Sequence, residues 1–223
     1  MYNRKIVLDF DGTICRLFAN YDLNAVNERV GVLMKDFDID FPVTLDLFDS
    51  FNYVSEFAKP HQKQELLLSL DEIITEVETE ALESGIIIAG FYEFLDFAKS
   101  ENICIGIASN NSEKCIREFL NKYCDYIDIP VAGRDPLHPE LMKPDSYILE
   151  KICNKMECTN KDVVFIGDNI RDYECAKKYD TDFIALTPTS KKYERIVENG
   201  LDVNRINIVK DFFELIALLR ASK

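Results

Sequence analysis

The sequence predicts an α/β protein in which a doubly wound parallel sheet is interrupted by an all-helical insert. Three observations support this fold class. Short apolar runs recur along the chain, amphipathic patterns separate most of them, and one long stretch near the start has helical patterns only. The runs are apolar on both faces, which is typical of parallel strands covered by helices on both sides. The expected strands are residues 5–10, 103–109, 126–133, 163–168, 183–187 and 206–209.

Three amphipathic helices are expected between the later strands. Residues 111–123 place their apolar side chains on one face. Residues 143–156 do the same, and we expect Pro144 in the first turn of that helix, where proline is tolerated. The third helix is expected over residues 171–179. Alternating strands and helices fold with right-handed crossovers, so this part of the chain predicts a Rossmann-like core.

Residues 14–88 interrupt this alternation and contain no convincing strand before the run that begins at Gly85. Apolar spacing predicts three or four helices there, over about 22–37, 44–58 and 62–84. Gly85 is the expected C-cap of the last helix. We therefore predict two parts, an α/β core of residues 1–14 and 87–223 and a helical cap of residues 15–86.

The chain is acidic, with 26 Lys and Arg against 40 Asp and Glu in 223 residues and a formal net charge of −14. Nucleic-acid-binding proteins usually carry the opposite charge, so we expect no nucleic-acid partner. The N-terminal residues lead directly into the first strand, and no apolar run approaches the length of a membrane helix. We therefore expect a cytoplasmic protein with no signal peptide and no membrane partner.

Carboxylates follow two of the predicted strands at the same edge of the sheet. Asp9 and Asp11 come at the end of the first strand, and Asp168 and Asp172 come at the end of strand 163–168. Ligands of open parallel sheets bind outside the carboxyl ends of the strands. We therefore expect these four carboxylates to converge on one site.

Two polar residues and a lysine are expected at the same edge. Ser109 and Asn110 follow strand 103–109, and Lys143 comes from the loop before strand 163–168. The segment 109–112 opens a helix, and the backbone amides of a helix N-terminus form a ready anion site. This chemistry favours a ligand that carries a phosphate group.

Clustered carboxylates repel one another and raise one another's pKa, and a divalent cation relieves that repulsion. The chain has two histidines, and its seven cysteines include no CxxC pair, which disfavours zinc. Hard oxygen ligands favour Mg²⁺. The expected metal ligands are Asp9, Asp11, Asp168 and Asp172.

The spacing of Asp9 and Asp11 separates their roles. We expect Asp9, at the end of the strand, to present its carboxylate to the site, and Asp11 lies where the chain turns at Gly12. Asp11 can offer its backbone carbonyl to the metal and keep its side chain for proton transfer. Gly12 permits close approach of backbone amides to a phosphate. The expected substrate-binding residues are Gly12, Thr13, Ser109, Asn110 and Lys143.

Four segments resemble the motifs of the haloacid dehalogenase-like hydrolase superfamily, in order and across almost the whole chain. They are "DFDGT" at 9–13, "IASN" at 107–110, "KP" at 143–144 and "GDNIRD" at 167–172. The helical insert after the first motif resembles the members with a helical cap, of the phosphoglycolate phosphatase and β-phosphoglucomutase type. The haloacid dehalogenases themselves lack the second aspartate, so Asp11 favours phosphoryl transfer over carbon–halogen chemistry.

The resemblance implies a magnesium-dependent phosphatase that acts on a small phosphorylated metabolite. Asp9 would attack phosphorus and form an aspartyl-phosphate. Asp11 would protonate the leaving oxygen and then take a proton from the attacking water. The catalytic set is therefore Asp9, Asp11, Ser109 and Lys143.

The resemblance also implies roles for the supporting residues. Ser109 would hold the phosphoryl oxygens, and Lys143 would balance the charge of the nucleophile and phosphate. Asp168 would bind Mg²⁺ together with Asp9 and the Asp11 carbonyl. Asp172 would hold a metal-bound water or the lysine.

Two other functions share these motifs. A phosphomutase differs mainly in its cap and returns the phosphoryl group to the sugar. A phospho-accepting receiver module also clusters aspartates, but its acceptor follows a later strand and it has no helical insert. Arg16 and Arg134 lie near the expected site. We interpret each as a surface charge, although either could bind a second anionic group of a substrate.

Overall fold

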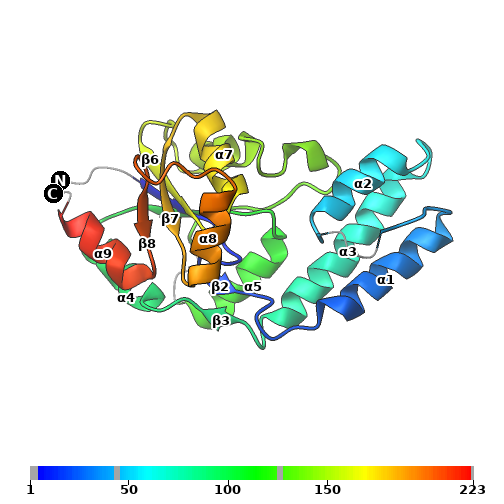
Figure 1. Cartoon of the computed structure of the whole chain (residues 1–223), viewed down its shortest axis with the longest axis horizontal. Coiled ribbons are helices and arrows are strands. Elements are labelled where there is room, and N and C mark those ends of the chain that lie inside the picture. The colour runs from blue at the N-terminus through cyan, green and yellow to red at the C-terminus, as the bar shows by residue number, and fades with distance from the viewer. Residues whose placement is uncertain (1–4, 43–45, 125–127, 222–223) are drawn as a thin grey trace.

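The computed structural model describes residues 5–42, 46–124 and 128–221. Its core is a six-stranded sheet with the order β5-β4-β1-β6-β7-β8 (Figure 1). Every neighbouring pair is parallel, which confirms the predicted fold class. The strands are β1 (Lys5–Leu8), β4 (Ile105–Ala108), β5 (Val131–Ala132), β6 (Val163–Gly167), β7 (Asp182–Leu186) and β8 (Asn207–Val209).

Successive strand residues point to opposite faces of this sheet, and each face has its own hydrophobic core. In β1, Ile6 and Leu8 belong to one cluster and Val7 to the other. The first cluster includes side chains of α4 (Phe91–Ser100), α5 (Glu113–Tyr123) and α9 (Phe212–Ala221). The second includes side chains of α6 (Tyr147–Lys155), α7 (Ile170–Tyr179) and α8 (Ser190–Glu198). The strands are therefore apolar on both faces because helices cover both.

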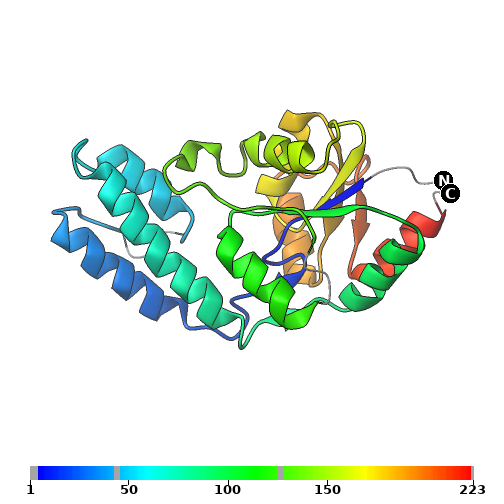
Figure 2. The same cartoon turned by 180° about the vertical axis from the view of Figure 1, so that it is seen from behind.

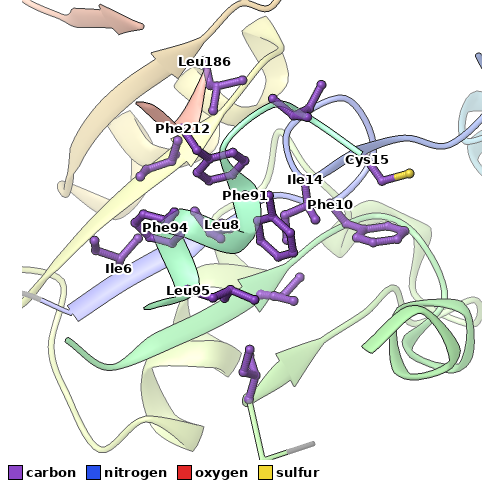
Figure 3. Close-up of a cluster of buried hydrophobic side chains, with 14 of the residues drawn as sticks. Ile6, Leu8, Phe10, Ile14, Cys15, Phe91, Phe94, Leu95, Leu186 and Phe212 are labelled. Atoms are coloured by element: carbon purple, nitrogen blue, oxygen red, sulfur yellow. The ribbon is translucent and has the colours of Figure 1, made fainter. Parts of the chain in front are cut away.

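Aromatic packing joins two helices that are far apart in the sequence. The rings of Phe91 and Phe94 from α4 lie 5.2 Å and 5.1 Å from the ring of Phe212 at the start of α9 (Figure 3). All three side chains are buried. Burial of one such side chain contributes about 1.5–3 kcal/mol, so this group fixes α4 and α9 side by side on the sheet.

The insert after the first strand is all-helical, as predicted. It contains α1 (Leu23–Asp36), α2 (Asp49–Phe57) and α3 (Lys63–Ala81), which pack together beyond one end of the sheet (Figures 1 and 2). These helices share a third hydrophobic cluster, which includes Val30, Phe51 and Leu70. The cap therefore has a core of its own.

The two chain segments that connect core and cap pair with each other. Strand β2 (Cys15–Arg16) runs antiparallel to β3 (Ile86–Ile87). The expectation of no strand between residue 14 and the apolar run that begins at Gly85 was wrong for β2, because a two-residue strand is too short to show a periodic pattern. The boundaries at 14/15 and 86/87 stay a prediction, and both fall at this pair.

Two helix ends differ from the prediction. Helix α3 ends at Ala81 with Leu82 as its C-cap, so Gly85 does not cap it. Helix α6 begins at Tyr147, and Pro144 lies before it, after a cis peptide bond to Lys143. A residue that precedes proline is disfavoured in helical conformation, which agrees with a loop here.

Two predicted elements extend into residues outside the described ranges. Of the strand expected over 126–133, Val131–Ala132 is strand among the described residues. Of the helix expected over 44–58, residues 46–48 are not helical, and the helix begins at Asp49. A short 3₁₀ turn, Pro139–Leu141, was not predicted. Across the described ranges, no helix is both long enough and apolar enough to cross a membrane.

Candidate active site

The three central strands bring the predicted site residues together. Strand β1 lies between β4 and β6 and runs parallel to both. Asp9, Ser109 and Asp168 each follow one of these strands directly. The Asp9 backbone N–H also donates to the carbonyl of Ile166 at 2.9 Å, which continues the ladder to the point where the chain turns.

The Asp9 carboxylate is buried and held on both of its oxygens. The Lys143 Nζ and the Ser109 hydroxyl donate to its Oδ1 at 2.5 Å and 2.9 Å. The Thr13 hydroxyl lies 3.3 Å from its Oδ2. Lys143 and Ser109 therefore both bind Oδ1, whereas Oδ2 has only the longer contact with Thr13.

Lys143 bridges two buried carboxylates. Its Nζ also donates to Asp172 Oδ1 at 2.6 Å. Burial alone would lower the pKa of Lys143, but the charges of Asp172 and Asp9 outweigh that effect and raise it above its ordinary value. Asn110 fixes the lysine backbone, since its side chain accepts from Lys143 N at 2.9 Å and donates to Lys143 O at 3.2 Å.

Asp172 uses its second oxygen to cap the helix that follows β6. Its Oδ2 accepts from the backbone N–H groups of Asp168 and Asn169 at 3.2 Å and 3.0 Å. Asn169 completes a capping box at the start of α7. A Cβ on Gly167 would lie 2.5 Å from the Asp172 side chain, so the close approach requires glycine. Burial raises the pKa of Asp172, against the opposing charge of Lys143.

Three buried carboxylates could hold a metal ion. Asp9, Asp168 and Asp172 each offer one oxygen, and these oxygens lie within 4.8 Å of one another. Carboxylate oxygens are the ligands that Mg²⁺ prefers, so this set fits the predicted ion. Among the described residues, the Asp11 carboxylate is not part of this group.

The Asp11 side chain turns toward the connection to the cap. Its Oδ1 accepts from the backbone N–H of Leu17 at 2.8 Å. Burial raises the pKa of Asp11 to about 6, against the lowering effects of that hydrogen bond and of Lys192. A carboxyl with this pKa can both give and take a proton near neutral pH.

Gly12 makes the turn that follows the two aspartates. Its φ is +95°, in the left-handed region, where a side chain is strained. A Cβ at this position would also lie 2.5 Å from Asp168 Oδ2. The turn at Gly12 thus lets the backbone approach the carboxylates closely.

A carboxylate of the cap reaches the loop after β4. Glu78 on α3 is buried and accepts from Asn111 Nδ2 and from the Ser112 backbone N–H, each at 3.0 Å. Arg134 Nη1 donates to the same carboxylate at 2.6 Å, and Arg134 Nε donates to Asp71 Oδ1 at 2.6 Å. The interpretation of Arg134 as a surface charge was therefore wrong, because its side chain is 1% exposed.

A cavity of about 610 Å³ opens above the carboxylates. Asp9, Ser109 and Lys143 line one part of it, and Asp46 and Phe48 line another. Arg171 of α7 also connects the core to the cap at this cavity. Its Nη2 donates to both carboxylate oxygens of Asp49 at 2.8 Å.

Basic residues that sequence reasoning missed line the rest of this cavity. Helix α8 contributes Lys191, Lys192 and Arg195. The Lys192 ammonium forms an ion pair with Asp168 Oδ2. Burial lowers the pKa of Lys192, and the charges of Arg16 and Arg195 add to this effect, against the charges of Asp11 and Asp9. Their position in the sequence could have indicated these basic residues, because α8 begins soon after strand β7 ends, and ligands bind at the carboxyl ends of parallel strands.

The match to known families agrees with this geometry. The family model described as haloacid dehalogenase-like hydrolase matches residues 6–186. The chain belongs to the haloacid dehalogenase-like hydrolases. A haloacid dehalogenase-like hydrolase domain-containing protein of Arabidopsis thaliana is 26% identical over 178 residues, which cover 78% of this chain and 67% of that protein.

Solved structures share this fold along almost their whole length. A predicted phosphatase from Clostridium acetobutylicum has a TM-score of 0.68 at 18% identity, with 98% of this chain and 99% of that chain covered. A predicted phosphoglycolate phosphatase from Haemophilus somnus has a TM-score of 0.64 at 17% identity, with 100% and 99% covered. The core and the cap of this haloacid dehalogenase-like hydrolase therefore have the same arrangement as in these solved structures.

Proposed function

We propose that this hydrolase is a magnesium-dependent phosphatase that cleaves a small phosphate monoester through an aspartyl-phosphate on Asp9. The observation that carries this proposal is the Asp9 carboxylate, held by Lys143 and Ser109 within the buried acidic cluster at the cavity. Family membership and relatives that are named as predicted phosphatases support it.

In the first half-reaction, a carboxylate oxygen of Asp9 forms a bond to phosphorus as the bond from phosphorus to the leaving oxygen breaks. Asp11 gives its proton to that leaving oxygen, so the product departs as a neutral alcohol. The raised pKa of Asp11, about 6, supports this role because part of the population holds the proton near neutral pH.

In the second half-reaction, water attacks phosphorus and Asp11 takes a proton from it. The bond between phosphorus and the Asp9 oxygen breaks, which releases inorganic phosphate and restores the carboxylate. Asp11 thus gains the proton that it lost in the first half-reaction, and the cycle closes.

Charge stabilisation must supply most of the rate acceleration for a phosphate monoester. Lys143 stays protonated beside Asp9, and the Ser109 hydroxyl and the amides of the following loop can donate to the phosphoryl oxygens. Asp9, Asp168, Asp172 and the Asp11 carbonyl would hold Mg²⁺. When bound, Mg²⁺ supplies further neutralisation of the phosphoryl charge.

Replacement of the proposed nucleophile tests this function. We expect Asp9→Asn to lower phosphate release from p-nitrophenyl phosphate by more than about 10³-fold, because loss of a catalytic nucleophile has effects of this order or larger. A thermal melt of the variant controls for folding. Full turnover by Asp9→Asn would reject the nucleophile, and isomerised sugar phosphate without free phosphate would favour the phosphomutase.

A further inference from the structure

One wall of the cavity carries more positive charge than the proposed chemistry uses. Arg16 on β2 and the α8 residues Lys191, Lys192 and Arg195 all line it. Lys143, Ser109 and the loop amides already serve the phosphoryl group. The additional cations are notable in a chain with a formal net charge of −14.

Most arginines in the described part of the chain have a carboxylate partner. Arg29 pairs with Glu76, and Arg171 pairs with Asp49. Within the described residues, Arg16 and Arg195 form no ion pair with a carboxylate, although both line the cavity. Like charges placed together without counter-ions repel one another, so an anionic ligand would stabilise this arrangement.

Two of the other cations that line the cavity already have a carboxylate partner. Lys192 pairs with Asp168, and Arg171 pairs with Asp49. Apart from Arg16, the residues between 15 and 86 that line the cavity are the acidic Asp46 and the apolar Phe48. Asp46 lies 3.9 Å from the Arg171 guanidinium, which opposes its charge. Arg16 and Arg195 are therefore the arginines left to meet a second anionic group.

The size of the cavity agrees with a ligand larger than phosphate alone. Its volume of about 610 Å³ lies within the range of roughly 300–1,000 Å³ that is usual for small-molecule sites. Guanidinium groups bind carboxylates and phosphates through paired hydrogen bonds. A small organic phosphate with an anionic far end would satisfy both parts of the cavity.

We propose that Arg16 and Arg195 form a second anion subsite that selects phosphate monoesters whose leaving group carries its own carboxylate or phosphate. This proposal rests on the phosphatase function proposed above. Arg16 lies on the connection between core and cap, and Arg195 lies on a core helix. The leaving group is thus recognised partly outside the helical cap.

Three substrates with the same two-carbon backbone test the proposal. They are 2-phosphoglycolate, ethane-1,2-diol bisphosphate and 2-hydroxyethyl phosphate, which end in a carboxylate, a phosphate and a neutral hydroxyl. We expect the wild type to prefer at least one anionic substrate in kcat/KM. Arg16→Gln and Arg195→Gln should each lower kcat/KM for that substrate by about 10- to 100-fold and for the neutral one by less than about threefold, as expected for loss of a charged hydrogen bond. The anion preferred by the wild type distinguishes a carboxylate from a phosphate.

Arg205→Gln is the matched control, because Arg205 is highly exposed and does not line this cavity. It should leave all three substrates unchanged. Equal turnover of the neutral and anionic substrates by the wild type would overturn the subsite while leaving the phosphatase function intact. An equal loss on all three substrates in the arginine variants would also overturn it. If the wild type released phosphate from none of these substrates or from p-nitrophenyl phosphate, both proposals would fall.

Discussion

Lys143 is the residue whose charge keeps the acidic cluster together. Its ammonium lies 2.5 Å from Asp9 and 2.6 Å from Asp172, and all three side chains are almost fully buried. Without this cation, two carboxylates would face each other away from water. A buried charge that loses its partner costs far more than a surface pair contributes. The same contact that would balance charge in the reaction therefore also stabilises the fold.

Removal of the ammonium should show both effects. We expect Lys143→Met to lower kcat with p-nitrophenyl phosphate by at least about 100-fold and the free energy of unfolding by about 3–5 kcal/mol. Steady-state kinetics and urea titration measure the two quantities.

A surface lysine provides the control for this prediction. Lys161 pairs with Asp180 at 2.6 Å, but both side chains are exposed. Lys161→Met should change the free energy of unfolding by less than about 1 kcal/mol and leave kcat unchanged. Lys143→Met with wild-type kcat would show that the ammonium does not act in the reaction.

At the scale of elements, helix α3 of the cap is connected to the loop that precedes α5 of the core. The connection is Glu78, whose carboxylate accepts from Asn111, Ser112 and Arg134. This loop begins at Ser109, which donates to Asp9. The position of α3 is thus linked through hydrogen bonds to the segment that we expect to bind the phosphoryl group.

Loss of the Glu78 carboxylate should disturb both stability and phosphate binding. In Glu78→Leu, the buried donors of Asn111 and Ser112 lose their acceptor. Arg134 loses one carboxylate partner and keeps Asp71, the Thr75 hydroxyl and the Asn110 carbonyl. We expect the free energy of unfolding to fall by about 3–5 kcal/mol. We also expect the inhibition constant of orthophosphate to rise at least about fivefold, in an assay with p-nitrophenyl phosphate below the melting temperature.

The matched control is another ion pair between cap and core. Asp49→Asn weakens the contact with Arg171, but both side chains are more than a third exposed. It should lower the free energy of unfolding by less than about 1 kcal/mol and leave orthophosphate inhibition unchanged. If both variants changed the inhibition constant equally, cap attachment in general, and not Glu78 at the loop, would be responsible.

At the scale of the whole molecule, metal binding should be visible as stability. Because the three carboxylates gather only in the folded chain, an ion that binds them stabilises that state. At a Mg²⁺ concentration of 100 times Kd, we expect about 2.7 kcal/mol of added stability and a higher Tm. Asp168→Asn should abolish most of this shift in calorimetry. An unchanged shift in the variant would place the ion elsewhere.

Much of this site could be predicted because its residues come directly after predicted strands in the sequence. Parallel strands place their carboxyl ends at one edge, so the approach of Asp9, Ser109 and Asp168 follows from local patterns plus topology. The Glu78–Arg134 pair could not be predicted, since 56 residues separate its members and packing alone brings them together. The short strands β2 and β3 carry no periodic signal. The start of α6 was placed too early because Pro144 lies in a loop.

Trapping of the phosphorylated enzyme tests the central proposal most directly. In Asp11→Asn, the residue that would take a proton from water is lost, so the aspartyl-phosphate should accumulate after mixing with p-nitrophenyl phosphate and Mg²⁺. We predict one added phosphoryl group on the peptide that contains Asp9, seen by mass spectrometry at acidic pH and removed by hydroxylamine. A phosphoryl group on another residue, or rapid quenching of the active wild type that detects no acyl phosphate during turnover, would contradict this account.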